Sequence, residues 1–509
     1  METKKINGRN FSFLLPYINT FLLIIILFVV TFRFGWHAKP DQIQPIMLVC
    51  IAGSILASIV YGIVKKFTWK EAVTLLIAIG LIMRIGYMLY TTIAVRYHDI
   101  GYLSLEGSGH AGYILYILRN HQLPPTNNFQ FYHPPLFHFL AALMCGMLEQ
   151  VVHFVDDGQV LEAGKVISCV ASCWSLLLVP NICNHLKMNQ RATCIAVAIV
   201  ALFPNCYLLA GRLNNDSLSV YFLILAVLYT IKWYQEQTWT NTIVLAFAIG
   251  LGMMTKLSVG TMAFFTGPIM LIILYRKIIE KNWQGLFAKL AAFGGLVFPL
   301  GLWHSIHHYI VFKQPFGYVL PISKDAEIYK GYVSPIKRFL DFTLSNLFEP
   351  LYCHPQKDYN INEYIIQCSV FGEFEYNMQE FLPKVVAEFI PRALVGINII
   401  MVGISLYAMY DILVNGKKLN CMLRFGIPAL WGIVYVFYIH FNIQYPFGCT
   451  MDYRYIVPTA FTGAICIGAL YDRLREKDTW KAKIARTVVI ASTSIFCIFS
   501  ILMYCFIAV

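Results

Sequence analysis

Long runs of apolar residues recur along the chain and are separated by short polar or basic turns. Most runs are about 18 residues or longer, the length that an α-helix needs to cross the hydrocarbon core of a bilayer. The pattern predicts an all-α polytopic membrane protein with about thirteen transmembrane helices. The expected spans are 12–33, 44–64, 71–94, 162–185, 192–211, 217–234, 239–254, 257–275, 288–308, 390–413, 424–440, 456–472 and 487–507.

The composition agrees with this pattern. Hydrophobic residues make up 58% of the chain and charged residues only 13%, which excludes a soluble multidomain protein. The basic N-terminal residues lead into an apolar run at 11–31. That run is too long for a typical signal peptide and lacks a small-residue cleavage site, so we expect a retained span.

The net charge of +12 would suit a nucleic-acid partner, but the positions of the charges favour another explanation. Basic residues gather in turns that would all lie on one side of the membrane. They are Lys4, Lys5 and Arg9; Lys65, Lys66 and Lys70; Lys187 and Arg191; Arg276, Lys277 and Lys281; Lys417, Lys418 and Arg424; and the run from Arg473 to Arg486. The positive-inside rule then predicts a cell-membrane protein with a cytoplasmic N-terminus, an external C-terminus and no nucleic-acid partner.

Two large loops, 95–161 and 309–389, fall on the opposite, extracytoplasmic side. The first holds an amphipathic segment at 109–120, which predicts a helix on the membrane surface. It also holds the apolar stretch 134–154. If that stretch spanned the membrane, every later basic turn would lie outside, so we expect a re-entrant or interfacial helix. Loops of this length in a compact protein are usually functional.

These features divide the chain into four predicted regions. They are two N-terminal transmembrane helices at 1–70, a catalytic transmembrane module at 71–308, an external region at 309–389 and C-terminal transmembrane helices at 390–509.

The first candidate for chemistry is Asp99, which follows the third predicted span. A carboxylate at a membrane–water boundary can serve as a general base, because burial and nearby cations set its pKa. The competing interpretation is a solvated loop carboxylate. His98, His110 and His133 share the same loop, so a bound divalent cation is an open alternative, although their spacing is irregular.

Tyr132 and His133 precede Pro134 and Pro135. A proline pair of this kind starts a helix, and it also forms a rigid turn that could direct His133 towards Asp99. We include His133 among the catalytic candidates, and His98, His110 and Tyr132 as further site residues.

Four more charged residues lie at external ends of predicted spans. Arg212 and Asp216 belong to the string GRLNND, for which the alternative is a polar helical hairpin. Lys256 interrupts two apolar runs, either as a functional cation or as a lysine that reaches the lipid headgroups. Arg454 begins a span, where a guanidinium can bind phosphate through its planar fork. We expect Lys256, Arg454 and Arg212 to bind a phosphate.

Other polar residues have more than one explanation. Arg84 lies inside a predicted span, where an ion pair with a neighbouring helix is the alternative to a functional role. His304, His307 and His308 suit an interfacial belt as well as ligation. Of the 14 cysteines, Cys353 and Cys368 share one external loop and could form a disulfide. The chain has no glycine-rich nucleotide cradle, so a lipid-linked donor fits a transferase better.

Together these motifs resemble the GT-C superfamily of polyprenyl-phosphate-sugar-dependent glycosyltransferases. The matching strings are Asp99 after a span, YHPPL at 132–136, GRLNND at 211–216, Thr255-Lys256, and Arg454-Tyr455 with Pro458. Within that superfamily the chain is similar to family 39, the protein O-mannosyltransferases and the bacterial aminoarabinose transferase, and its HDIG and GHAGYI strings resemble bacterial members. The resemblance extends over about 84–460 and implies a GT-C fold.

The resemblance also implies roles. Asp99 would be the catalytic base, Asp216 a second external acid, and Lys256 and Arg454 the ligands of a lipid phosphate. The chain departs from many relatives at Ile100, where they carry a second acid, which weakens any inference about a metal. Two extra spans also precede the Asp99 loop.

The expected function is inverting transfer of a hexosyl or pentosyl group from a polyprenyl phosphate to an acceptor lipid, glycan or protein at the external face. A secondary transporter or flippase of a lipid-linked or anionic substrate is the alternative, although the internal repeats usual in transporters are missing. A structural scaffold would not require acids and cations on one face.

Overall fold

The computed structural model describes residues 14–95, 99–101, 108–127, 129–349, 351–373 and 375–508. Helices account for most of them, as the apolar pattern predicted. The α-helices are α1 (Leu15–Arg33), α2 (Pro40–Val64), α3 (Trp69–Tyr90), α4 (Gly109–Asn120), α5 (Leu136–Glu149), α6 (Asp157–Glu162), α7 (Lys165–His185), α8 (Gln190–Ala201), α9 (Pro204–Ala210), α10 (Asp216–Gln235), α11 (Trp239–Thr255), α12 (Ala263–Ile279), α13 (Gln284–Phe312), α14 (Pro335–Leu340), α15 (Ile361–Phe371), α16 (Lys384–Asn415), α17 (Ile427–Gln444), α18 (Pro458–Arg475) and α19 (Trp480–Phe506).

Short 3-10 helices and one π-helical turn join them. The 3-10 helices are η2 (Leu257–Met262), η3 (Leu344–Leu347), η5 (Gly448–Met451) and η6 (Tyr453–Tyr455), and the π-helical turn is η4 (Met422–Gly426). Two short strands, β1 (Asn377–Met378) and β2 (Ile507–Ala508), pair in antiparallel fashion. The segment that contains β1 is therefore hydrogen-bonded to the last described residues of the chain.

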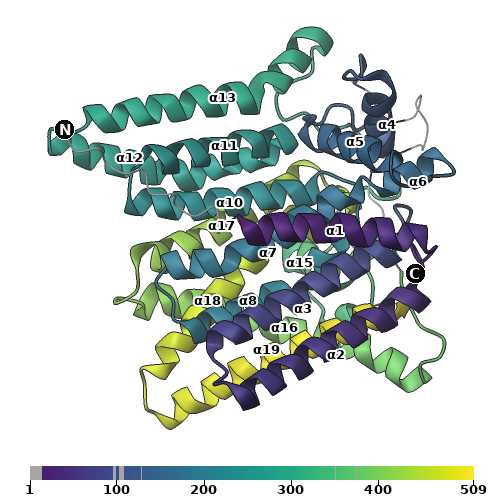
Figure 1. The fold of residues 1–509 in the computed structure, drawn as a ribbon. Coiled ribbons are helices and arrows are strands. Elements are labelled where there is room, and N and C mark those ends of the chain that lie inside the picture. Colours follow the sequence, from purple (N-terminus) through teal and green to yellow (C-terminus); the bar gives the residue numbers. More distant parts are fainter. Residues whose placement is uncertain are drawn as a thin grey trace, which may run out of the picture.

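The long helices run side by side, and α4, α5 and α6 gather at one end of the bundle (Figure 1). In the described part of the chain, ten helical segments are long and apolar enough to cross a membrane, or eleven if α8 and α9 form one bent span. The all-α polytopic architecture is thus confirmed, whereas the count of thirteen is not. Two of the expected spans are not among the ten. α11 has only 17 residues, and α18 carries charged residues at its C-terminal end.

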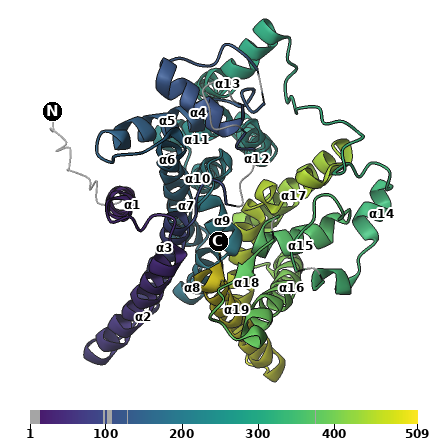
Figure 2. The ribbon, with the colours of Figure 1, turned by 90° about the vertical axis from the view of Figure 1, so that its right-hand side faces the viewer.

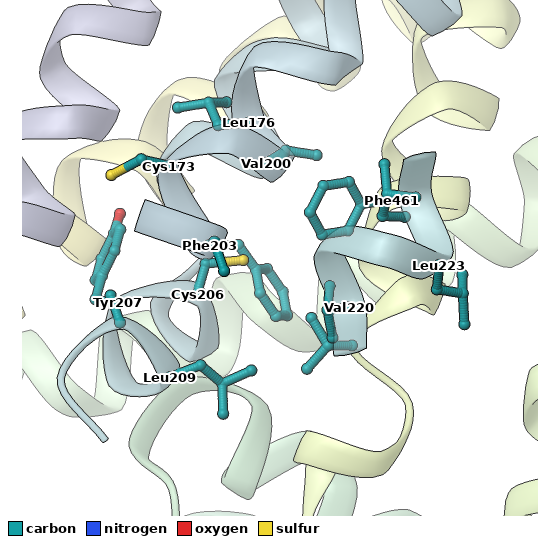
Figure 3. Packing of buried hydrophobic residues seen from close by; sticks show 14 of the residues in the cluster. Cys173, Leu176, Val200, Phe203, Cys206, Tyr207, Leu209, Val220, Leu223 and Phe461 are labelled. Carbon is teal, nitrogen blue, oxygen red and sulfur yellow. The ribbon is translucent and has the colours of Figure 1, made fainter. Parts of the chain in front are cut away.

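The expected span at 192–211 is broken. α8 ends at Ala201, α9 begins at Pro204, and their axes differ by 51°. The proline suits the first turn of a helix because it lacks the backbone N–H that would be unsatisfied there. The core around this break includes Phe203, Cys206 and Tyr207 (Figure 3).

Arg84 stabilises the break between α8 and α9 through hydrogen bonds to the end of α8. Its fully buried guanidinium donates hydrogen bonds to the carbonyl oxygens of Val200 (2.8 Å) and Ala201 (2.6 Å), at the C-terminal end of α8. It also donates to Ser172 Oγ at 3.1 Å. The alternatives considered from the sequence were an ion pair or a functional role. Instead, Arg84 satisfies carbonyl groups that the end of a helix leaves without a partner.

The segment 134–154 forms α5, which has 14 residues. At about 1.5 Å per residue it is shorter than a bilayer core of about 30 Å. This length agrees with an interfacial or re-entrant helix and not with a span. The predicted helix at 109–120 is confirmed as α4. Arg119 at its end pairs with Glu149 (2.9 Å) and Asp157 (2.7 Å), which ties α4 to α5 and α6.

The segment 309–389, expected to be external, contains α14, η3, α15 and β1. It lies on the side of the molecule occupied by α16 and α17, away from α2 (Figure 2). Cys353 and Cys368 are both free thiols, so the structure does not contain the disulfide considered from the sequence. The division of the chain into four functional regions stays a prediction.

Candidate active site

A cavity of about 700 Å³ opens between the loops before α4 and α5, the starts of α10 and η2, the segment at 314–322, α17 and η6. It contains most of the residues singled out from the sequence: Asp99, His110, Tyr132, His133, Asp216, Lys256 and Arg454 all line it. We call Asp99, Asp216, Lys256 and Arg454 the cavity cluster. His98 lies outside the described residues.

The loop that carries Asp99 is fixed by close backbone contacts. The N–H groups of His110 and Ala111, in the first turn of α4, donate to the carbonyl oxygens of Asp99 and Ile100, each at 3.0 Å. Gly101 adopts a φ of 69°, and a Cβ added there would lie 1.9 Å from the Ser108 carbonyl oxygen. Asp99 itself has a φ of 56°, an uncommon value for a residue other than glycine.

A second glycine completes this contact. Gly109 has a φ of 80°, and a Cβ there would meet the Ile100 carbonyl oxygen at 2.2 Å. The glycines of HDIG and GHAGYI are therefore needed for the two strings to touch. Backbone strain of this kind is often found at functional sites, where the surrounding structure maintains it.

Arg454 joins the two acids of the cavity cluster. Its Nη1 lies 3.0 Å from Asp99 Oδ2, although the residues are 355 positions apart in the chain, and 3.5 Å from Asp216 Oδ2. Its Nη2 donates to the hydroxyl of Tyr455 at 2.9 Å. Burial alone would lower the pKa of Arg454, but Tyr455 and the surrounding carboxylates outweigh burial and raise it well above its ordinary value. The guanidinium stays charged.

Lys256 occupies the break between α11 and η2. Its ammonium group donates to Asp216, the first residue of α10, and lies 4.9 Å from the centre of the Tyr455 ring. The lysine side chain is 15% exposed, whereas that of Asp216 is 3% exposed. Lys256 is therefore the more accessible member of this pair, and it faces the cavity.

The structure adds Asp452, which the sequence analysis did not select. Its Oδ2 lies 3.5 Å from Arg212 Nη1 and 3.6 Å from Arg454 Nε, and its Oδ1 accepts the backbone N–H of Arg454 at 3.0 Å. Cys368 Sγ also donates to Oδ1, at 3.0 Å. The Asp-x-Arg spacing at the start of a span was the available signal, because a side-chain oxygen there can accept from the N–H two residues later.

Arg212 lies one layer behind the cavity. It is 3% exposed and, within the described chain, is not one of the residues that line the cavity. Its interaction with Asp452 makes it a support for Arg454. The neighbouring Glu373 is also buried, and burial followed by the charge of Asp452 raises the pKa of its carboxyl group well above the ordinary range.

The histidines of the first loop form a column of nearly parallel rings. His133 lies over His110 (5.7 Å between ring centres, 13° between planes), His110 over His138 (5.1 Å, 15°), and His138 over Tyr113 (4.0 Å, 17°). His110 and His138 share a 2.8 Å hydrogen bond. Burial, above all, lowers the pKa of His110, His133 and His138, so all three rings are neutral at pH 7.

His138 was missed from the sequence because one histidine within an apolar run gives no spacing signal. His304 and His308, considered as ligands or as belt residues, have ring centres 4.1 Å apart with their planes tilted by 35°. Among the described residues, no group of three or more His, Cys, Asp or Glu side chains is arranged to hold a metal ion. The carboxylates of Asp99 and Asp216 face Arg454 and Lys256 instead, and the divalent cation considered from the sequence stays a prediction.

This geometry places the carboxylates of Asp99 and Asp216 and the cationic groups of Lys256 and Arg454 in one partly enclosed space. The carboxylate of Asp99, with its side chain 31% exposed, can accept a proton from a hydroxyl group. Lys256 and Arg454 can stabilise an anion, since preorganised charges act strongly where water is largely excluded.

Comparisons with known proteins agree with part of this interpretation. Residues 132–303 match the family model described as dolichyl-phosphate-mannose-protein mannosyltransferase. The matched segment contains His133, Arg212, Asp216 and Lys256. No curated protein matches the chain.

Two solved structures are similar at low identity. One is the crystal structure of ArnT from Cupriavidus metallidurans in the apo state, with 11% identity, a TM-score of 0.36, and coverage of 85% of this chain and 75% of that chain. The other is the same protein bound to undecaprenyl phosphate, with 10% identity, a TM-score of 0.36, and coverage of 85% and 76%. Bacterial origin and the family 39 subtype stay predictions. The resemblance to GT-C glycosyltransferases indicated by the motifs is confirmed by the family model over residues 132–303.

Proposed function

We propose that the protein is a membrane glycosyltransferase that moves a sugar from a polyprenyl phosphate to an acceptor hydroxyl at the extracytoplasmic face of the cell membrane. The observation that carries this proposal is the cavity cluster, in which Arg454 joins Asp99 and Asp216 beside Lys256. The family model over 132–303, whose description names a dolichyl-phosphate-mannose donor, supports the same class of reaction.

The cavity has a polar and an apolar part that suit the two parts of such a donor. Val220, Leu223, Val259, Val434 and Phe437 line one side of it. An isoprenoid chain can pack against these side chains. Lys256 and Arg454 would then meet the phosphate, because an ammonium group has two donors left after its bond to Asp216 and a guanidinium offers several.

Asp99 would act as the general base. Its ion pair with Arg454 orients the carboxylate within the cavity. A donor phosphate would compete for Arg454 and weaken this pair, so the basicity of Asp99 would rise when the donor is bound. The acceptor oxygen then attacks the anomeric carbon opposite the phosphate and loses its proton to Asp99, which inverts the configuration.

The leaving group determines the role of the cations. The transition state resembles an oxocarbenium ion, as in glycoside hydrolysis. The C–O bond to the phosphate breaks with its electron pair on oxygen, and polyprenyl phosphate departs as an anion. Lys256 and Arg454 stabilise this negative charge, at about 3–4 kcal/mol for a well-placed donor.

The test is incubation of the purified protein with a panel of polyprenyl-phosphate sugars, in which released polyprenyl phosphate is measured. We expect release from at least one donor and a loss of about 10²–10⁴-fold in the variant Asp99→Asn. Asp478→Asn is the matched control, because the side chain of Asp478 is 89% exposed.

Full activity of Asp99→Asn at equal expression would disprove the role of Asp99. Saturable donor binding without release from any donor would favour the transporter or flippase instead.

A further inference from the structure

Beside Asp99, the cavity contains a buried amide that has no partner for its oxygen. Gln130 lines the cavity and is 4% exposed, and within the described chain its Oε1 has no hydrogen-bond partner. An unsatisfied buried carbonyl oxygen costs free energy, so it marks a place where a ligand can donate a hydrogen bond. The backbone of Gln130 has a φ of 68°, an uncommon conformation that is often kept for function.

Aromatic rings surround this amide. Tyr132, two residues after Gln130, also lines the cavity, and its ring meets that of Tyr318 edge to face with 5.3 Å between centres. Phe129 and Phe316 line the same part of the cavity. Flat apolar faces beside a hydroxyl-binding amide are the groups that recognise a carbohydrate ring, because its carbon-bound hydrogens pack on aromatic faces while its hydroxyls need acceptors.

The position of Tyr132 assigns this subsite to the acceptor. Backbone hydrogen bonds tie this segment to the Asp99 loop: the Gly109 N–H donates to the Phe129 carbonyl oxygen at 2.7 Å, and the next N–H along the chain, that of His110, donates to the Asp99 carbonyl oxygen at 3.0 Å. Lys256, in contrast, pairs with Asp216 on the side where the donor phosphate is expected. A hydroxyl group held by Gln130 and Tyr132 would therefore approach Asp99, as the acceptor must.

The charges of the cavity restrict the acceptor further. Among the described lining residues, the charged side chains are Asp99, Asp216, Lys256 and Arg454, two of each sign and already paired with one another. The donor phosphate would use both cations. The segment 314–322 on the acceptor side contributes only uncharged lining residues, including Gln314. A phosphorylated acceptor would bring a second anion to a site with no further cation for it.

We infer that the acceptor is a neutral carbohydrate, held by Gln130 and Tyr132 with the aromatic wall of Tyr318. That this saccharide is the acceptor rests on the proposed function, but its binding can be tested without turnover. Two other acceptor classes, a phosphorylated glycolipid and a serine- or threonine-containing peptide, are alternatives that the same experiments separate.

The first experiment measures binding to the purified full-length protein by calorimetry. The probes are neutral disaccharides, the corresponding sugar phosphates and a serine- and threonine-rich peptide. We expect a neutral disaccharide to bind best and its affinity to fall about tenfold in Gln130→Asn, which keeps an amide and suits the left-handed backbone but has a shorter side chain. Gln122→Leu, at an exposed glutamine on the neighbouring turn, is the control and should bind as the wild type does.

Tighter binding of the sugar phosphate or of the peptide would overturn the inference, as would unchanged disaccharide binding in a folded Gln130→Asn variant. The second experiment adds each probe to the donor assay. Faster release of polyprenyl phosphate with the neutral saccharide supports the inference, and faster release with a phosphorylated acceptor overturns it. If no donor is cleaved but the saccharide binds through Gln130, the proposed function fails and the saccharide site stands.

Discussion

The protein contains two clusters of buried charges, and they differ in what surrounds them. In the first, Glu162 lies between Lys165 (2.6 Å) and His37 (3.1 Å), and we call these three residues the Glu162 cluster. Their remaining bonds go to the backbone: Glu162 accepts from Ile93 N–H at 2.8 Å, and Lys165 donates to the carbonyl oxygens of Met88 (3.1 Å) and Thr91 (2.5 Å). The second is the cavity cluster.

Burial alone does not distinguish the two clusters. The side chain of Lys165 is 0% exposed and donates to carbonyl oxygens at the C-terminal end of α3. The side chains of Lys256 and Asp99, in contrast, keep exposed surface within a cavity. A buried charge whose bonds all go to the protein is a structural element, and charges that share accessible space can act on a ligand. The Glu162 cluster still matters for the site, because it fixes residues 91–93 just before the Asp99 loop.

The comparison predicts that substitutions in the cavity cluster lower activity by more than any accompanying loss of stability explains. Arg454→Met should show the largest effect, at least about 10³-fold in donor cleavage, because it removes a phosphate ligand and the cation that faces the carboxylates of Asp99, Asp216 and Asp452. Polyprenyl phosphate release is the measurement. Arg392→Met, at a guanidinium that pairs with Glu388 on the surface, is the control. Activity within tenfold of the wild type would show that Arg454 is structural.

Damage to the Glu162 cluster should act on stability instead. Glu162→Gln leaves a fully buried lysine without its counter-charge, and we expect the free energy of unfolding to fall by about 3 kcal/mol. Thermal unfolding in detergent measures this. Glu280→Gln breaks an exposed glutamate–lysine pair of the same spacing and should cost at most about 1 kcal/mol. Equal shifts in the two variants would contradict the distinction.

A third variant separates the two cations of the cavity cluster. Lys256→Gln should reduce donor cleavage by about 10²-fold, less than the loss of Arg454, because Arg454 still compensates Asp216. The effect should include a higher KM for the donor. Lys337→Gln, at a lysine whose side chain is 62% exposed, should leave both constants unchanged.

The last prediction concerns the pH dependence of stability. The pKa of His110 and His138 is depressed by burial, so the unfolded chain binds more protons than the folded one below its own histidine pKa of about 6.5. Stability should therefore fall as the pH drops from 6.5 towards 5, by up to about 1.4 kcal/mol per pH unit for each histidine. The unfolding temperature between pH 5 and 7.5 tests this, and a flatter profile is expected in His138→Asn.

The four residues of the cavity cluster could be selected as candidates from the sequence, and their catalytic roles stay predictions. Asp99, Asp216, Lys256 and Arg454 stood out because a charged residue at the end of an apolar run is costly without a role. Asp452 and His138 were missed because one lies beside a more prominent arginine and the other within an apolar helix. Arg212 was predicted to bind the donor phosphate. In the structure it pairs with Asp452 and is not among the described residues that line the cavity.

The amino-acid sequence by itself determined the apolar helices, the glycines that let the Asp99 loop touch the start of α4, and the charged residues available for chemistry, because these depend on neighbours a few positions away. Only the tertiary structure decided that α8 and α9 form a broken helix, that Arg84 holds the break, and that Arg454 meets Asp99 across 355 residues. Such pairings depend on how helices pack. Local periodicity carries no information about which helix ends will meet.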